Sequence, residues 1–425
     1  MRYLYSFLLY LSIPFALVRL MWKARRAPAY AKRWSERFAW IKVPAKYQQG
    51  LWIHSVSVGE TLAAVPMIKQ IQALYPALPM IVTTTTPTGS ERVQALLGDK
   101  VFHVYMPYDL PGAVSRFLNR IQAKMVLIME TELWPNVFHA CQQRKIPIMI
   151  ANARLSEHSA KGYERFNGLT RDMLQCITVL AIQTQEEANR YIQLGMPADR
   201  IQVTGSIKFD ITIPEGLKEQ AMMFRQQWGQ ARPVWIAAST HSGEDEIVLD
   251  AFAEIKKSLP SLILMLVPRH PERFPQVVAV CRKRGYQVVQ RSEKISCNEQ
   301  TEIFVGDTVG ELLLFYAAAD IAFVGGSFVP VGGHNLLEPA ALGLPSVTGP
   351  HLHNFKEISR LLADAKASWV VHNEKELAQQ VLNLLQDSTV RCEAGERGRN
   401  VVLQHRGALS KHIQIISSLV DAAFL

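Results

Sequence analysis

Acidic side chains follow predicted strands in the first half of the chain, where parallel strands would present them at one edge of a sheet. Glu60 comes after the predicted strand Leu51–Val56 and the turn residue Gly59, so its side chain can face a ligand. A carboxylate there can take a proton from a hydroxyl as a new bond forms, which typically accelerates a reaction by about 10²–10⁴-fold. A glutamate in the first turn of a helix can also serve only to complement the helix dipole.

Two further glutamates, Glu130 and Glu132, end the predicted strand Met125–Met129. Side chains at positions i and i+2 of a strand point the same way, so both carboxylates are expected on one side of the sheet edge. They could support an oxocarbenium-like centre or hold sugar hydroxyls. Structural salt bridges are the alternative, because they are common for such residues.

Basic side chains near the same edge could bind an anion. Lys208 lies just beyond the predicted strand Ile201–Gly205, where a cation could neutralise a leaving phosphate or a carboxylate as charge builds. A solvated lysine between two domains is the alternative. Arg154 is a weaker candidate for the same anionic group.

The second half carries a glycine-rich stretch, Gly325–Pro345, that follows a predicted strand. Its glycines allow the backbone to approach a ligand closely, and Asn335 is a suitable N-cap for a helix from Leu336 to Leu342. A helix N-terminus with free amides at the end of a parallel strand is an anion site. Glu338, in the first turn, suits ribose hydroxyls. A glycine-rich loop with a purely structural cap is the other interpretation.

An arginine in a fixed loop follows another predicted strand. Pro268 and Pro271 restrain the loop, and Arg269 offers a planar fork of donors that suits an anion. His270, between them, is interpreted as a loop residue.

Short apolar strands alternate with amphipathic helices along the chain, which predicts parallel α/β sheets with helices on both faces. One series runs from Leu51 to Gly205, and a second begins at Val234. Ligands of such sheets bind at the carboxyl ends of the strands, and two halves in tandem commonly bind a ligand in the cleft between them.

The charge of the chain is concentrated at one end. The 425 residues carry a formal net charge of +9, and residues 1–46 hold ten Lys or Arg against the single acid Glu36. The remaining charges cancel, which argues against a nucleic-acid surface and for a local patch that faces an anionic partner. The five scattered cysteines lack zinc-type spacing, so we expect reduced thiols and no metal site.

Residues 1–22 are predominantly apolar and are interpreted as a membrane anchor that either spans the bilayer or lies in its interface. No small-residue cleavage site follows, which argues against a cleaved signal peptide. The basic segment 23–48, with Trp34, Phe38 and Trp40, is expected against anionic headgroups on the cytoplasmic side. The alternative is a basic helix that packs on its own domain.

Six motifs occur together and in a fixed order from the first strand onward. They are His54–Glu60, Glu130–Asn136, Asn152–Ser156, Gly205–Asp210, Val267–Pro271 and the glycine-rich stretch. In this combination the chain resembles the 3-deoxy-D-manno-octulosonate (Kdo) transferases, which attach Kdo from CMP-Kdo to a lipid A precursor.

The resemblance implies a GT-B fold, in which two Rossmann-like domains face each other across a cleft, and inversion at the anomeric carbon without a metal or other cofactor. The expected segments are a membrane anchor (1–22), a basic membrane-facing segment (23–48), an acceptor domain (49–210), a linker (211–232), a CMP-Kdo-binding domain (233–405) and a C-terminal helix (406–425).

The resemblance also assigns roles to residues. Glu60 becomes the general base on the acceptor hydroxyl, Glu130 a stabiliser of the transition state, and Lys208 a partner of the donor's negative charge. The implied nucleotide pocket comprises Pro268, Arg269, Val309, Gly310, Glu311, Asn335, Leu336, Leu337 and Glu338. The weaker candidates are Glu132, Arg154 and Ser327.

The sequence thus predicts a lipid IVA Kdo transferase of lipopolysaccharide synthesis, held by a signal-anchor at the cytoplasmic face of a bacterial inner membrane. Its expected partners are CMP-Kdo, a lipid A precursor and an anionic membrane surface. The alternatives are another membrane-associated GT-B enzyme with a different nucleotide sugar and a non-catalytic nucleotide-sugar-binding protein. The acidic residues at the ends of the first strands argue against the last, because simple anion binding has no use for them.

Overall fold

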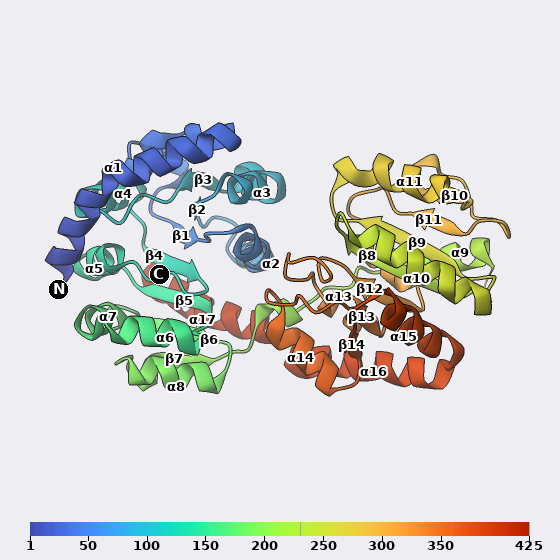
Figure 1. Ribbon diagram of the computed structural model, residues 1–425. Helices are drawn as coiled ribbons and strands as arrows, with labels where there is room; N and C mark the ends of the chain where they lie inside the picture. The colour runs from blue at the N-terminus through green and yellow to red at the C-terminus, as the bar shows by residue number, and fades with distance from the viewer. Residues whose placement is uncertain (230, 425) are drawn as a thin grey trace. The chain divides into compact units, whose positions relative to one another are not determined.

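The computed structural model describes residues 1–229 and 231–424, and the chain divides into two compact units (Figure 1). Unit 1 comprises Met1–Lys208 and also the end of the chain from Arg406. Unit 2 is the continuous segment Phe209–His405. Two positions inside the predicted segments, Gln230 and Leu425, lie outside the described residues.

A sheet of seven parallel strands forms the centre of unit 1. In order across the sheet the strands are β3 (Phe102–Tyr105), β2 (Met80–Thr84), β1 (Leu51–His54), β4 (Met125–Met129), β5 (Ile148–Ala153), β6 (Val179–Ile182) and β7 (Ile201–Val203). The central strands are buried along their whole length, as expected for a parallel sheet covered on both faces. On β1, Trp52 enters one layer and Leu51 and Ile53 the other.

Helices cover both faces of this sheet. One layer contains α4 (Pro111–Ile121), α5 (Pro135–Gln143), α7 (Asn167–Leu174) and α8 (Gln185–Gln193). The other layer contains α2 (Val58–Leu74), α3 (Pro87–Leu97) and α17 (Ala408–Phe424). Helix α6 (Glu157–Glu164) adds Ala160 to the first of these layers, and α1 (Arg2–Arg26) is the remaining α-helix described in the unit.

Unit 2 repeats this plan with a second sheet of seven parallel strands. Across the sheet they are β10 (Val288–Gln290), β11 (Ile303–Val305), β9 (Ile263–Pro268), β8 (Val234–Thr240), β12 (Ile321–Val324), β13 (Ser346–Thr348) and β14 (Ser368–Val370). The helices are α9 (Leu217–Trp228), α10 (Glu244–Ser258), α11 (Phe274–Lys283), α12 (Leu312–Ala317), α13 (Leu337–Ala341), α14 (Lys356–Asp364), α15 (Glu374–Gln386) and α16 (Ser388–His405). Two parallel sheets, each between helical layers, confirm the predicted α/β class with two Rossmann-like units.

The predicted linker and the predicted C-terminal helix both belong to the compact units. The segment 211–232, predicted as a linker, contains α9 and lies inside unit 2, because Leu217, Ala221 and Trp228 are buried in the core of that unit. The C-terminal helix α17 packs on unit 1, where Ile416 and Val420 join the core layer of α2.

The basic segment 23–48 does not face outward throughout. Arg37 is buried and donates to the carbonyl of Thr85 at 3.0 Å. Arg33 pairs with Glu36 at 2.6 Å, and the guanidinium groups of both arginines lie over the ring of Tyr105. These two cations therefore pack on their own domain, in contrast to the expectation that the whole segment lies against headgroups.

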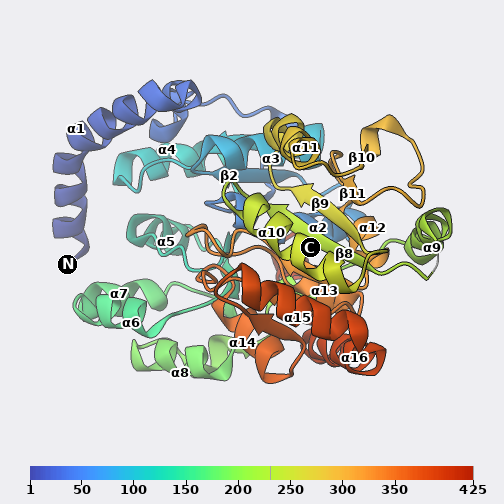
Figure 2. The same ribbon diagram turned by 45° about the vertical axis from the view of Figure 1, so that its right-hand side comes forward.

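Helix α1 lies beside α4 and α5 of unit 1 in both views (Figures 1 and 2). Among the described residues it is the one helix that is long and apolar enough to cross a membrane, by length and composition only. Signal sequences and core helices of soluble proteins can meet the same criteria, so the helix by itself supports membrane association only weakly.

Candidate active site

The strand order of unit 1 reverses between β1 and β4, and the loops that follow these two strands carry the predicted acidic residues. Ligands of open α/β sheets bind at such a switch point, at the carboxyl ends of the strands. Glu60, Glu130 and Glu132 come together here. The charges of Glu60 and Glu130 both raise the pKa of the Glu132 carboxyl.

Glu60 lies in the first turn of α2, where Ser57 is the N-cap. Its amide donates to the Ser57 hydroxyl oxygen at 3.3 Å, and its carboxylate accepts from the Ser57 hydroxyl at 2.9 Å and from the Val56 amide at 2.7 Å. Burial raises the pKa of the Glu60 carboxyl, although these hydrogen bonds oppose the rise. The turn thus fixes the orientation of the carboxylate and leaves it more basic than a solvated glutamate.

Glu130 and Glu132 lie in the loop after β4, so the strand alternation predicted for them does not apply. Glu130 has a left-handed backbone with φ 55°, and its amide continues the sheet by donating to Ala151 at 2.9 Å. Burial, and then the charges of Glu60 and Glu130, raises the pKa of Glu132 to about 7. The loop therefore brings the two carboxylates together by a different geometry from the expected one.

Lys208 is the cation of this cluster. Its Nζ lies 3.8 Å from a carboxylate oxygen of Glu130, and both side chains are partly exposed. The preceding residue Ile207 is held by its amide, which donates to the Asn152 side chain at 3.1 Å. The backbone amide of Asn152 in turn donates to His412 Nε2 at 2.8 Å. His412 of α17 therefore contributes to the placement of Lys208, a role that local sequence patterns do not reveal.

Arg154 follows β5 at the same edge, but its side chain is exposed. Its backbone carbonyl accepts a hydrogen bond from the hydroxyl of Thr131, within the loop of Glu130 and Glu132. The structure thus ties the Arg154 backbone to the acidic loop and leaves the guanidinium at the surface.

In unit 2 the strand order reverses between β8 and β12, and a buried carboxylate joins the two loops that follow. Glu244 is fully buried at the start of α10. One oxygen accepts from the amides of Ser327 and Phe328, both at 2.9 Å, and the other from Gly326 at 2.7 Å and His241 at 2.9 Å. The first amides of the glycine-rich stretch are therefore occupied by the protein's own carboxylate, whereas the predicted anion site was the helix N-terminus later in the stretch.

Ser327, a weaker candidate, is also structural. It is fully buried, its hydroxyl donates to the carbonyl of Val324 at 2.7 Å, and it accepts from the amide of Gly349 at 2.9 Å. With both hydrogen bonds made inside the fold, Ser327 has no surface for a substrate.

The later part of the stretch leads into the short helix α13. Asn335 accepts from the amide of Leu337 at 3.1 Å and donates to Glu338 at 3.1 Å. Helix α13 begins one residue later than expected, so the N-cap residue is Leu336 and not Asn335. Leu336 is fully buried in the core, as is Leu337, so the side chains of these two residues serve packing. Burial raises the pKa of Glu338, which is partly exposed.

Arg269, His241 and His270 gather around His334. Arg269 is exposed, and its charge acts on both Glu338 and His334. His241 Nε2 lies 2.8 Å from His334 Nε2, and the ring of His270 stands edge-on to His241 with centroids 5.2 Å apart. Burial and then the charge of Arg269 lower the pKa of His334 to about 4, so that imidazole is neutral at pH 7. Pro268 ends β9 directly before Arg269.

The remaining predicted residues, Val309–Glu311, precede the short helix α12. Val309 is 80% exposed, and Gly310 has a left-handed backbone with φ 93°. Glu311 pairs with Arg291 at 2.7 Å and accepts from the Thr308 hydroxyl, and the hydrogen bonds from Arg291 lower its pKa. The Glu311 carboxylate is therefore already engaged.

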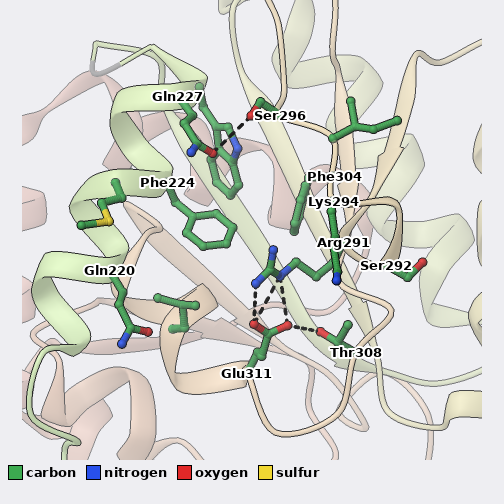
Figure 3. A pocket seen from close by; sticks show the side chains of 14 residues that line it. Gln220, Phe224, Gln227, Arg291, Ser292, Lys294, Ser296, Phe304, Thr308 and Glu311 are labelled. Carbon is green, nitrogen blue, oxygen red and sulfur yellow. Dashed lines mark hydrogen bonds and ion pairs between the residues drawn. The ribbon is translucent and has the colours of Figure 1, made fainter.

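This ion pair borders a cavity of about 590 Å³ in unit 2 (Figure 3). Phe224 and Trp228 of α9 and Phe304 of β11 form its apolar wall, and the guanidinium of Arg291 lies over the ring of Phe224 at 5.0 Å. Glu311 is the only residue of the predicted nucleotide set among the residues that line the cavity.

Comparison with known proteins gives the family. A family model described as 3-deoxy-D-manno-octulosonic-acid transferase (kdotransferase) matches residues 32–211. A 3-deoxy-D-manno-octulosonic acid transferase of Haemophilus influenzae is 41% identical over 99% of both chains. One from Bordetella pertussis is 33% identical over 93% of this chain and 95% of the relative.

The chain belongs to the 3-deoxy-D-manno-octulosonic acid transferase family. The Kdo transferase is therefore a glycosyltransferase, as the motifs indicate. A solved glycosyltransferase of Rickettsia africae, 13% identical, covers 88% of this chain and 99% of its own with a TM-score of 0.54, which supports the GT-B fold alone.

Within the described part of the transferase, no group of three or more His, Cys, Asp or Glu side chains is arranged to hold a metal ion.

Sequence reasoning missed three contributors to the transferase's loops: Glu244, His241 and His412. Only the position of Glu244, at the N-terminus of a helix after β8, carried a local signal. Each of the three contacts at least one residue that lies 82 or more positions away along the chain, and these contacts depend on the sheet order.

Proposed function

We propose that this transferase moves Kdo from CMP-Kdo to a lipid A precursor, lipid IVA, with inversion at the anomeric carbon. The reaction belongs to lipopolysaccharide core synthesis and takes place at the cytoplasmic face of a bacterial inner membrane. Family membership supports the transfer of Kdo. The observation that carries the mechanism is the cluster of Glu60, Glu130 and Glu132 beside Lys208.

Glu60 acts as the general base. The acceptor hydroxyl oxygen forms a bond to the anomeric carbon of Kdo, the hydroxyl proton passes to the Glu60 carboxylate, and the bond to the CMP phosphate breaks with its electrons. A carboxylate offers about four acceptor positions, and the bonds from the Val56 amide and the Ser57 hydroxyl use two of them. The raised pKa makes Glu60 a stronger base than a solvated glutamate.

The other charges of the cluster set its electrostatics. With a pKa near 7, Glu132 is partly protonated at neutral pH, so three adjacent carboxylates need not carry three full charges. Glu130 remains to face the positive charge that develops on the sugar ring. Lys208 meets the negative charge of the donor as the phosphate leaves.

Unit 2 holds the nucleotide. Arg269 is exposed and can pair with the phosphate of CMP, while Glu338 and Asn335 offer hydrogen-bond partners for the ribose. The Glu244 carboxylate fixes the loop before them by four backbone hydrogen bonds, which holds this part of the pocket in one conformation before the donor binds.

A pair of variants separates the base from the helix cap. Glu60→Gln keeps the side-chain shape and the backbone hydrogen bond to the Ser57 cap. Ser57→Ala removes the cap, at about 0.5–2 kcal/mol, and keeps the carboxylate. With CMP-Kdo and lipid IVA, and mass spectrometry of the lipid, we expect Glu60→Gln to lose at least about 10²-fold in rate. Ser57→Ala should lower the melting temperature and still transfer Kdo.

Binding of CMP, followed by thermal shift, should be nearly unchanged in Glu60→Gln. Turnover of this variant at the wild-type rate would disprove the base assignment. Loss of CMP binding would instead indicate a role in donor binding.

A further inference from the structure

Helix α1 turns one stripe of side chains toward unit 1 along its whole length. These side chains are buried or half-buried and recur every three or four positions, as one face of a helix does: Arg2, Ser6, Leu9, Ile13, Ala16, Leu20 and Lys23. A helix surrounded by lipid has no such stripe, because all of its sides meet the same medium. The burial pattern shows a helix that lies along a protein surface.

A buried polar network fastens the first turns of this helix. The Tyr5 hydroxyl donates to the Asp109 carboxylate at 3.1 Å, and the Ser6 hydroxyl donates to Asn136 at 3.1 Å. Asp109 is 3% exposed and also accepts from the amides of Asn136 and Val137, at 3.0 and 2.8 Å. One carboxylate therefore caps the start of α5 and holds α1 against it.

The opposite face of α1 is apolar and exposed. Its residues also recur every three or four positions, are 52–79% exposed, and are Leu4, Leu8, Leu11, Phe15, Val18 and Trp22. Tyr3, Phe7 and Tyr10 widen the same surface. A continuous apolar surface of this kind marks an interaction site.

Cations lie near the C-terminal end of the helix. Arg19 and Arg25 are exposed, and Lys23 is half-buried. An apolar face bordered by Lys and Arg matches the boundary of an anionic bilayer, where acyl chains meet negatively charged headgroups. The charge complementarity therefore selects a lipid surface as the occupant rather than an uncharged apolar partner.

We propose that α1 lies in the plane of the membrane interface, with its exposed face in an anionic lipid surface and its other face fastened to unit 1 through Asp109, and that it does not cross the bilayer. The inference rests on the proposed membrane location and adds the mode of attachment. A helix of 25 residues is about 37 Å long and would span if it stood upright. An upright helix would break the hydrogen bonds of Tyr5 and Ser6 to Asp109 and Asn136. The buried Asp109 carboxylate would then lose one of its donors.

Topology labelling distinguishes the two orientations. In the spanning arrangement Tyr3 would reach the side of the membrane opposite the basic segment. A Tyr3→Cys variant, expressed in a Gram-negative bacterium, is treated in intact spheroplasts with a membrane-impermeant maleimide and again after detergent lysis. We expect labelling above the wild-type level only after lysis. Labelling in intact spheroplasts would overturn the proposal. Lys32→Cys, on the cytoplasmic side in both arrangements, is the control.

The docking contact is tested by amide hydrogen exchange of residues 2–9 in the membrane-bound full chain. Tyr5→Phe removes one hydrogen bond to Asp109 and should speed exchange at least about threefold, whereas Tyr3→Phe, at an exposed tyrosine, should not. Asp109→Asn should act more strongly, and Tyr5→Phe remains informative if that variant fails to fold. Equal exchange in the wild type and Tyr5→Phe would contradict the docked arrangement.

Cell fractionation keeps the two hypotheses apart. Wild-type protein found wholly in the soluble fraction would refute the proposed membrane location. Protein that is membrane-bound and released by alkaline carbonate supports attachment in the interface, because spanning helices resist this extraction. Membrane-bound protein that resists carbonate would refute the in-plane arrangement and leave the location intact.

Discussion

Glu244 occupies the position where the glycine-rich loop of unit 2 could otherwise have received an anion from solution. Its two oxygens accept four backbone hydrogen bonds, which uses the full acceptor capacity of a carboxylate. A Cβ at Gly325 would stand 2.6 Å from the carbonyl oxygen of Ser239, so glycine is needed for this close approach. The loop is thus built around an internal anion, and a substrate must use the groups beyond it.

Replacement of this carboxylate should destabilise unit 2. Glu244→Gln turns two acceptor positions into donors that face backbone N–H groups, and each buried unsatisfied group costs about 1–3 kcal/mol. We expect a loss of roughly 2–5 kcal/mol in urea denaturation, together with weaker CMP binding. Glu246→Gln, in the same first turn but exposed, is the matched control. Equal stability of the two variants would show that the four hydrogen bonds contribute little.

Glu132 should make the stability of unit 1 depend on pH. Its pKa rises from an ordinary 4.5 to about 7 in the folded protein, so the folded state binds the proton more tightly between these values. Stability from this group is full below pH 4.5 and is lost as pH rises through 7. Glu132→Gln stays neutral, so its stability relative to wild type should rise between pH 5 and pH 8, by at most about 3 kcal/mol.

Thermal or urea denaturation at the two pH values measures the Glu132 effect. The exposed Glu91→Gln variant should show the same difference from wild type at both. A pH-independent difference for Glu132→Gln would mean that this carboxyl titrates normally.

At the scale of elements, continuous apolar runs were sufficient to locate most strands. Met125–Met129, Val179–Ile182 and Ile321–Val324 begin and end where the apolar runs do. The strand Phe102–Tyr105 was not predicted, because it lies at the sheet edge, where its first two residues are only half-buried and the pattern is weak. Burial on both faces leaves a clear signal in sequence, and burial on one side of an edge does not.

The acidic site was predictable in its residues but not in its geometry. Glu60, Glu130 and Lys208 follow strands, which is enough to place them at one sheet edge. The left-handed turn at Glu130 and the contact of Asn152 with His412 depend on packing between distant segments. Local sequence patterns carry no information on such contacts.

Helix α17 is the element whose loss should damage unit 1 most. Ile416 is fully buried in the layer beside α2, and removal of a buried isoleucine side chain typically costs about 2–5 kcal/mol. We expect Ile416→Ala to lower the free energy of unfolding by this amount in urea denaturation. Lys411→Ala, on the exposed side of the same helix, should change it by less than about 0.5 kcal/mol. Equal effects of the two variants would mean that α17 packs only loosely on unit 1.

At the scale of the whole molecule, the two units differ in how the chain builds them. Unit 2 is one continuous segment, whereas unit 1 needs the residues that return after His405. The sequence shows two α/β series, but it does not show that the last helix completes the core of the first. Truncation from the C-terminus should therefore unfold unit 1 before it affects unit 2.

The continuity of unit 2 allows a direct test of donor specificity. Residues 209–405 contain both core layers of this unit and the predicted nucleotide residues, so we expect this fragment to fold alone and to bind CMP. A ligand at 100 times its dissociation constant stabilises a protein by about 2.7 kcal/mol, which raises the melting temperature of a domain of this size by roughly 5–10 °C. UDP at the same concentration should raise the melting temperature much less.

Arg269→Ala should remove most of the CMP response, whereas Arg282→Ala, at another exposed arginine, should retain it. An equal response to CMP and UDP would contradict the assignment of CMP-Kdo as donor, and a full CMP response in Arg269→Ala would place the nucleotide elsewhere in unit 2.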